Sequence, residues 1–296
     1  MPFRQEQAFR LAQDRPFKQV DVFTATAYRG NALAVVLDGS GLDNEAMQRF
    51  ARWTKLSETT FLLPPSQAGA DYRVRIFTPG GELPFAGHPT LGSCHAWLEA
   101  GGVPGQERIV VQQCEVGLVQ IRQQAPRLAF AAPALRRSAP SPALLGQVAE
   151  ALGVRAEEVV ATQLLDNGPV WLALLLDQPE TVLRLAPNHA RLKTIGQKVG
   201  VAGIYRDAPA GGTASPMLEV RAFAAPIGIE EDPVTGSLNA SLAQWLIAEG
   251  HLPGAYIAAQ GSKLDRAGRV HIERDAEAQV WVGGESVTCI TGRVAL

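Results

Sequence analysis

Two distant parts of this chain carry nearly the same text, and this internal repeat is the feature that most constrains the fold. The segment VRIF at 74–77 returns as VRAF at 220–223, a shift of 146 residues. The frame His88-Pro-x-x-Gly-Ser returns as Asp232-Pro-x-x-Gly-Ser, a shift of 144 residues. Because a repeat of this length holds a whole domain, the 296-residue chain is predicted to contain two homologous domains.

Each half combines short strand patterns with two helix patterns. Runs rich in β-branched and aromatic residues, such as DYRVRIF and RVHIER, indicate strands. One amphipathic helix is predicted over 43–55 and one over 141–153, and a further helix follows each copy of the frame. The further helices are apolar on nearly every side and stop at Gly101 and Gly250, which predicts that they are buried. We therefore predict an α+β fold with two pseudo-symmetric domains, each a mostly antiparallel sheet around a central helix.

The charge and residue usage exclude several kinds of partner. The net charge of −2 and the absence of a basic run argue against a nucleic-acid surface. No stretch approaches the ~20 apolar residues of a membrane span, and the N-terminal segment lacks the apolar run of a signal peptide. Cys94, Cys114 and Cys289 follow no CxxC spacing, which predicts reduced thiols and a cytoplasmic protein. The histidines outside the frame have no partners at metal-ligand spacing, so no metal is predicted.

The repeated frame indicates how a small acid is bound. The residue before a helix proline is predicted to be the N-cap, which places His88 and Asp232 at two helix starts. The first amides of a helix have no backbone partner and carry partial positive charge. Pseudo-two-fold symmetry would bring two such ends to one cleft, which suits a carboxylate. The alternative is that Asp232 is an ordinary helix cap without a functional role.

Small residues beside the frame complete this predicted substrate site. Gly87 and Gly236 allow close backbone approach, and Ser93 or Ser237 adds a hydroxyl donor. These four residues are the candidate substrate-binding residues. We predict that they hold a small-molecule carboxylate between the two domains.

Glu58 is the candidate acid–base group. It lies in KLSETTF at 55–61, after a predicted helix and directly before an apolar strand. Partial burial at the mouth of a strand raises the pKa of a carboxyl group and suits it to proton transfer. The alternative is a solvated glutamate at a helix end. With the repeat shift, its counterpart in the second half falls within 202–204, where no acid or base stands, so the chemistry is predicted to be asymmetric.

Four segments together resemble the PhzF family of phenazine biosynthesis-like isomerases: DVFTATAYRGNALAVVL, LSETTF, FTPGGELPFAGHPTLGS and EEDPVTGS. The resemblance covers most of the chain. It implies the fold of diaminopimelate epimerase, in which each domain is a β-barrel around a central helix. The expected domains are 1–135, completed by about 287–296, and 136–286. The resemblance also implies a homodimer and catalysis without a cofactor.

The resemblance assigns roles to the candidate residues. It implies that Glu58 moves a proton along an unsaturated amino acid, trans-2,3-dihydro-3-hydroxyanthranilate in the phenazine enzyme, with His88 and Asp232 assisting. Gly87 and the Gly236-Ser237 pair are expected to hold the substrate carboxylate. No symmetric cysteine pair exists for two-thiol racemisation, so one base favours a proton shift on a single face. An amino-acid epimerase and a non-catalytic protein that binds small acids are the alternatives.

Overall fold

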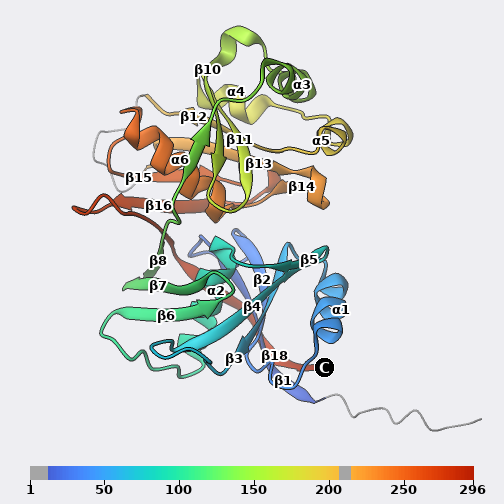
Figure 1. Ribbon diagram of the computed structural model, residues 1–296, viewed down its shortest axis with the longest axis vertical. Helices are drawn as coiled ribbons and strands as arrows, with labels where there is room; N and C mark the ends of the chain where they lie inside the picture. Colours follow the sequence, from blue (N-terminus) through green and yellow to red (C-terminus); the bar gives the residue numbers. More distant parts are fainter. Residues whose placement is uncertain (1–12, 207–214) are drawn as a thin grey trace, which may run out of the picture.

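Two lobes of similar build make up the part of the chain that the computed structural model describes, residues 13–206 and 215–296 (Figure 1). The N-terminal lobe is the lower one in the figure, and the chain enters the upper lobe after strand β8. Residues 1–12, the start of the N-terminal segment that is predicted to lack a signal peptide, lie outside the described residues. No helix of the described ranges is long and apolar enough to cross a membrane.

The N-terminal lobe contains two helices and most of the strands of the first half, together with the last strand of the chain. Its elements are β1 (Asp14–Val22), β2 (Asn31–Val36), α1 (Asn44–Thr54), β3 (Glu58–Leu63), β4 (Tyr72–Thr78), β5 (Gly81–Leu83), α2 (Gly87–Glu99), β6 (Ile109–Cys114), β7 (Gly117–Gln124), β8 (Arg127–Ala131) and β18 (Ser286–Ala295). β18 pairs with β1 in antiparallel fashion, so the C-terminal segment lies in the N-terminal lobe. The domain limits at residues 135 and 286 stay a prediction.

The C-terminal lobe repeats this plan and adds two short helices. Its elements are β9 (Arg136–Ser138), α3 (Pro142–Leu152), β10 (Val159–Asp166), β11 (Val170–Leu176), α4 (Pro179–Arg184), α5 (His189–Ile195), β12 (Lys198–Ile204), β13 (Leu218–Ala224), β14 (Ile229–Asp232), α6 (Gly236–Ala248), β15 (Ala255–Gln260), β16 (Gly268–Arg274) and β17 (Val280–Gly284). Short 3₁₀ turns cover Ala156–Glu158, Ala225–Ile227 and Ser262–Leu264.

Strand pairing has the same order in both lobes. β2 is antiparallel to β1 and parallel to β3, just as β11 is antiparallel to β10 and parallel to β12. β4 is antiparallel to β3 and parallel to β6, just as β13 is antiparallel to β12 and parallel to β15. β8 and β17 pair across the lobes and join everything into one continuous sheet. The predicted two-domain α+β architecture is confirmed.

The helices α2 and α6 form the centre of the two lobes. Buried side chains occur around the whole circumference of both helices, including Leu91 and Cys94 in α2 and Leu242 and Trp245 in α6. Both helices have 13 residues, and each is followed within two residues by a glycine with positive φ. The curved sheets bury these helices, as their uniformly apolar sequences predict.

The amphipathic helices lie outside the curved sheets, where only one face needs to be apolar. The predicted helix at 43–55 is α1, which packs Met47 and Phe50 against the outer surface of β3 and β4. The predicted helix at 141–153 is α3, which covers the outer surface of the second lobe with Val148 and Leu152. Both sequence predictions agree with the structure to within one residue at each end.

Candidate active site

The central helices of the two lobes begin at one point between the lobes. A β-carbon built on Gly236 would lie 3.0 Å from the Cα of Gly87 and 3.2 Å from the backbone nitrogen of His88. A β-carbon on Gly87 would lie 2.7 Å from the ring of Phe130. Only glycine allows this approach, and it brings the first amides of α2 and α6 together. No side chain of residues 13–206 or 215–296 caps either helix start, so these amides are available to an anion.

The prediction that His88 and Asp232 are N-cap residues is wrong. His88 is the second residue of α2, whereas Asp232 is the last residue of β14 and precedes α6 by a three-residue turn. The strand register shows which residues are equivalent. Ile76 in VRIF corresponds to Ala222 in VRAF. Leu83 pairs with Ile76 and Asp232 pairs with Ala222, so Leu83 is the equivalent of Asp232.

The aligned segments are therefore Leu83-Pro-Phe-Ala-Gly-His and Asp232-Pro-Val-Thr-Gly-Ser, with a shift of 149 residues. Proline and glycine keep their positions in both copies. The sequence comparison that starts at His88 aligns Pro89 with Pro233, whereas the strand register aligns Pro84 with Pro233. Under the corrected alignment, Gly87 is equivalent to Gly236, and His88 is equivalent to Ser237.

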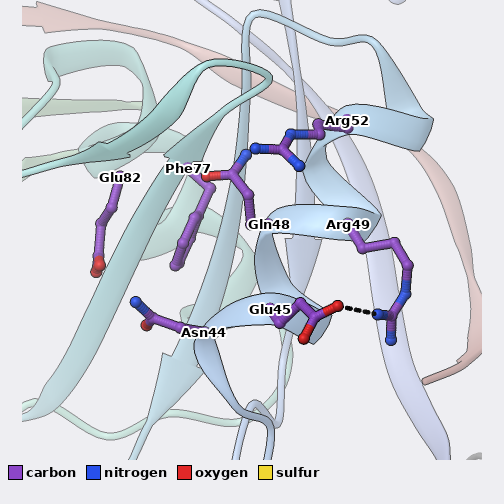
Figure 2. Close-up of a pocket in the computed structure, with 7 residues that line it drawn as sticks. All are labelled: Asn44, Glu45, Gln48, Arg49, Arg52, Phe77 and Glu82. Carbon is purple, nitrogen blue, oxygen red and sulfur yellow. Dashed lines mark ion pairs between the residues drawn. The ribbon is translucent and has the colours of Figure 1, made fainter.

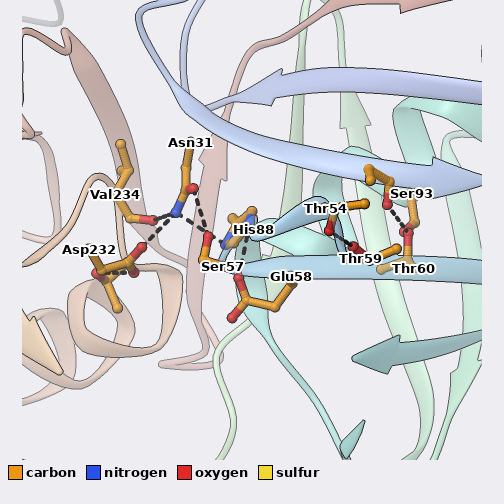
Figure 3. A network of polar contacts seen from close by, with 12 residues as sticks. Asn31, Thr54, Ser57, Glu58, Thr59, Thr60, His88, Ser93, Asp232 and Val234 are labelled. Atoms are coloured by element: carbon orange, nitrogen blue, oxygen red, sulfur yellow. Dashed lines mark hydrogen bonds and ion pairs between the residues drawn. The ribbon is translucent and has the colours of Figure 1, made fainter. Parts of the chain in front are cut away.

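His88 and Asp232 nevertheless lie in one polar cluster, because Asn31 joins them (Figure 3). The amide nitrogen of Asn31, the first residue of β2, donates to Asp232 Oδ1 at 2.9 Å and to the backbone oxygen of Val234 at 2.9 Å. The same nitrogen is 3.4 Å from His88 Nδ1. Ser57 donates to the Asn31 side-chain oxygen at 3.2 Å. The N-terminal lobe thus fixes the turn that carries Asp232 in the C-terminal lobe.

Glu58 faces His88 at the edge of this cluster. Its Oε2 atom lies 3.4 Å from His88 Nε2, and the side chains are only 13 % and 4 % exposed. Neither of these two atoms has a hydrogen-bond partner among the described residues. Burial, and then the negative charge of Asp232, raise the pKa of Glu58 to about 8. Near neutral pH the Glu58 carboxyl group therefore holds a proton in most molecules.

His88 is neutral at the same pH. Burial lowers its pKa to about 3, because the charged imidazolium is poorly solvated there. The contact between Glu58 and His88 is therefore a contact of neutral groups near pH 7, not an ion pair. The Asn31 side-chain nitrogen donates its two hydrogens to Asp232 and Val234, and the Nε2 atom of His88 points at the Glu58 carboxyl group.

Asp232 is held by hydrogen bonds on both oxygens. Thr235 donates to Oδ2 at 2.6 Å, and Asn31 donates to Oδ1 at 2.9 Å. Gln260, which is 1 % exposed, donates to the Asp232 backbone oxygen and accepts from the Thr235 amide, which fixes the turn before α6. Burial raises the pKa of Asp232 to about 6, although these side-chain hydrogen bonds act in the opposite direction. Asp232 is therefore the ionised carboxylate of the cluster at pH 7.

The two predicted serines have different positions. Ser237 lies in the first turn of α6, where its hydroxyl accepts a hydrogen bond from Trp171 Nε1 at 3.2 Å. Ser93 lies further along α2, is fully buried, and donates to Thr60 at 2.9 Å. Figure 3 shows the Ser93–Thr60 pair apart from the cluster around Asn31. The structure therefore brings Ser237 to the meeting point of the helices and leaves Ser93 inside the N-terminal lobe.

The predicted absence of a counterpart for Glu58 is wrong as well. Glu58 opens β3 opposite Leu33 of β2, and Lys198 opens β12 opposite Trp171 of β11. Lys198 is therefore the equivalent residue, with a shift of 140 residues. The constant shift taken from the loops misplaced it, because the segments between the strands differ in length.

Sequence reasoning also missed Asn31, although a signal was present. Asn31 lies in the RGNALAVVL segment, where one polar amide immediately precedes an otherwise apolar strand. Its side chain is 2 % exposed and fully engaged. A buried side-chain amide needs hydrogen-bond partners, and here those partners belong to the candidate site.

A separate surface pocket of about 470 Å³ lies beside α1 (Figure 2). Its lining consists of Asn44, Glu45, Gln48, Arg49, Arg52, Phe77 and Glu82. None of the predicted site residues lines this pocket. The candidate site is instead the narrow meeting point of the helix starts, with its polar atoms largely closed off from solvent.

The family model of the phenazine biosynthesis-like proteins matches residues 20–292 of this chain. A relative from the fission yeast Schizosaccharomyces pombe, named antisense-enhancing sequence 1, is 34 % identical over 95 % of this chain and 98 % of its own. The trans-2,3-dihydro-3-hydroxyanthranilate isomerase of Pseudomonas fluorescens is 30 % identical over 94 % of this chain and 98 % of its own.

Solved structures agree on the fold. The crystal structure of a Bacillus anthracis protein of the PhzF family superposes with a TM-score of 0.80 at 23 % identity, covering 96 % of this chain and all of the other. A probable proline racemase from Agrobacterium radiobacter superposes with a TM-score of 0.64 at 14 % identity, over 95 % of this chain and 93 % of the other. The fold is thus shared with both PhzF proteins and racemases.

The chain belongs to the phenazine biosynthesis-like, or PhzF, family, and it is an isomerase. The resemblance drawn from the four sequence segments is confirmed. The fold expected from that resemblance, two barrels each built around a helix, is confirmed as well. A homodimer and a cytoplasmic location stay predictions.

Proposed function

We propose that the chain moves a proton between two carbons of a small unsaturated carboxylic acid, with Glu58 as the only acid–base group that touches carbon. The environment of the Glu58 carboxyl group is the observation that carries this proposal. It is nearly buried, one of its oxygens has no hydrogen-bond partner among the described residues, and its pKa is raised to about 8. A carboxyl group with a pKa near the working pH both removes and returns protons efficiently.

The substrate carboxylate is held where α2 and α6 begin. The uncapped first amides around Gly87 and Gly236 provide donors and the positive ends of two helix dipoles. The Ser237 hydroxyl, which accepts from Trp171, has its own hydrogen available for the same carboxylate. A carboxylate fixed there lies beside the His88 and Glu58 side chains.

The reaction then needs no group beyond the side chains of the cluster. The ionised form of Glu58 takes a proton from a C–H bond that is activated by an adjacent double bond. The electron pair of that C–H bond shifts into the conjugated system, and the protonated Glu58 returns the proton to a carbon two positions away. The double bond has moved, and Glu58 is again ionised. His88, a neutral imidazole whose Nε2 atom faces the Glu58 carboxyl group, assists this transfer as a hydrogen-bonding neighbour of that group.

The named activity of the Pseudomonas relative makes trans-2,3-dihydro-3-hydroxyanthranilate the first substrate to test. The experiment incubates this substrate with the wild type or with Glu58→Gln in deuterium oxide and uses NMR to monitor the C–H signals of the substrate. The wild type is expected to shift the double bond and to incorporate deuterium at the receiving carbon, and Glu58→Gln is expected to lose at least 1,000-fold in rate, in line with the loss of a positioned acid–base group.

The matched control is Glu45→Gln, because the Glu45 side chain is 88 % exposed on α1 and lies outside the cluster. This variant is expected to keep the wild-type rate. Exchange at the α-carbon without a shift of the double bond would instead favour amino-acid epimerisation. Exchange that survives unchanged in Glu58→Gln would remove Glu58 from the role of base.

A further inference from the structure

Lys198 is the residue of the C-terminal lobe that stands where Glu58 stands in the N-terminal lobe. Each is the first residue of a strand that runs parallel to its neighbour, β3 beside β2 and β12 beside β11. Because the two lobes are related by pseudo-symmetry around the meeting point of α2 and α6, equivalent residues face that point from opposite sides.

The surroundings of Lys198 connect it to the same site. Its Nζ atom lies 5.8 Å from the centre of the Trp171 ring. Trp171 in turn donates to Ser237 in the first turn of α6, at 3.2 Å. Lys198 is also close to Glu58 and Asp232. The charges of both carboxyl groups affect the pKa of Lys198, and the charge of Lys198 affects the pKa of each carboxyl group. The ammonium group therefore lies at the substrate end of the C-terminal lobe.

The ammonium group of Lys198 has no hydrogen-bond or ion-pair partner within residues 13–206 and 215–296. The nearby carboxyl groups do not provide one. Glu58 and Asp232 affect the pKa of Lys198 through their charges, but among the described residues neither forms a hydrogen bond or an ion pair with it. A half-buried cation without a partner is a place where an anionic ligand gains a charge-assisted hydrogen bond.

We propose that Lys198 is the specificity-determining residue of the site and holds the substrate through a negatively charged carboxylate. This inference rests on the proposed function and deepens it. The helix-start amides orient the carboxylate, whereas Lys198 supplies the full charge that distinguishes an acid from its amide or ester. The substrates are then free acids, with the reacting carbon turned away from Lys198 toward Glu58.

Binding of two probes that differ only in charge tests this proposal without requiring turnover. Anthranilate and anthranilamide have nearly the same shape, but only anthranilate carries a carboxylate at pH 7. Titration calorimetry with the wild type is expected to show that anthranilate binds at least tenfold more tightly. Lys198→Met is expected to weaken anthranilate binding about 10- to 100-fold, as for the loss of a hydrogen bond to a charged group, and to leave anthranilamide binding unchanged.

Three further variants separate charge from structure. Lys198→Arg keeps the positive charge and is expected to restore part of the preference for the acid. Lys193→Met, at an exposed lysine of α5, is the matched control and should bind like the wild type. Glu58→Gln should keep anthranilate binding while it loses proton exchange, which separates a failure of this proposal from a failure of Glu58 as the base.

Two results would overturn the role of Lys198. One is equal affinity of Lys198→Met and the wild type for anthranilate. The other is a wild type that binds anthranilate no better than anthranilamide, or binds neither at millimolar concentration. A pH series adds an independent readout, because the Lys198 charge lowers the pKa of Glu58. In Lys198→Met the exchange reaction should require a higher pH.

Discussion

Replacing Glu58 with glutamine should make the protein more stable, although it should abolish proton transfer. Glu58 is nearly buried at the meeting point of the lobes, and its ionised form is poorly solvated there. Glutamine has almost the same shape and never ionises. The substitution therefore removes the free-energy cost of keeping this group protonated, or at high pH charged, in the folded protein, and leaves the packing of the site in place.

The size of the effect follows from the two pKa values. Glu58 titrates at about 8 in the folded protein and at 4.5 in an unperturbed chain. Between these values the folded protein keeps a proton that the unfolded chain releases, so the free energy of unfolding falls by about 1.4 kcal/mol per pH unit. The cost is about 3 kcal/mol at pH 7 and about 5 kcal/mol above pH 8.

Urea denaturation at pH 5, 6, 7 and 8 measures this difference. At pH 5 the Glu58→Gln variant should be more stable than the wild type by only about 1 kcal/mol. The advantage of the variant should then grow with pH, and the slopes of the unfolding curves should stay equal. Glu45→Gln controls for the loss of one carboxyl group at an exposed position. A constant difference across the pH range, or a variant that is less stable at pH 8, would refute a raised pKa for Glu58.

Three other substitutions test neighbouring parts of the site. Gly87→Ala places a methyl group 2.7 Å from the Phe130 ring and should abolish isomerisation while lowering the thermal midpoint, measured by circular dichroism. Asp232→Asn removes the negative charge that raises the pKa of Glu58, so the acid limb of the rate profile should move to lower pH. Ser93→Ala should leave KM unchanged, because this hydroxyl donates to a neighbouring threonine inside the N-terminal lobe.

The architecture could be predicted from the sequence because two strong local patterns recur in both halves. A helix that is apolar on every side is stable only when it is enclosed, and the chain contains two such helices, each preceded by strands. The observed enclosure of α2 and α6 by curved sheets follows from this requirement. The amphipathic helices at 43–55 and 141–153 were placed correctly for the complementary reason, since one apolar face suits the outside of a sheet.

The details of the site were not accessible from the sequence, because they depend on pairs of residues far apart in the chain. Asn31 contacts a turn that lies about 200 residues later, and no local pattern reports that contact. The loop alignment failed for a simpler reason. Short segments with proline and glycine match at more than one shift, and only the strand register, with Leu83 equivalent to Asp232, distinguishes the correct one.

The corrected alignment shows how a symmetric fold holds an asymmetric set of polar side chains. Pseudo-symmetry provides two equivalent positions at the strand starts and two at the helix starts, all beside the candidate site. The strand positions hold a carboxyl group in one lobe, Glu58, and an ammonium group in the other, Lys198. The helix positions hold an imidazole, His88, and a hydroxyl, Ser237. Under the proposed function, one lobe exchanges protons while the other holds charge, so a proton removed from one face of the substrate returns to that same face.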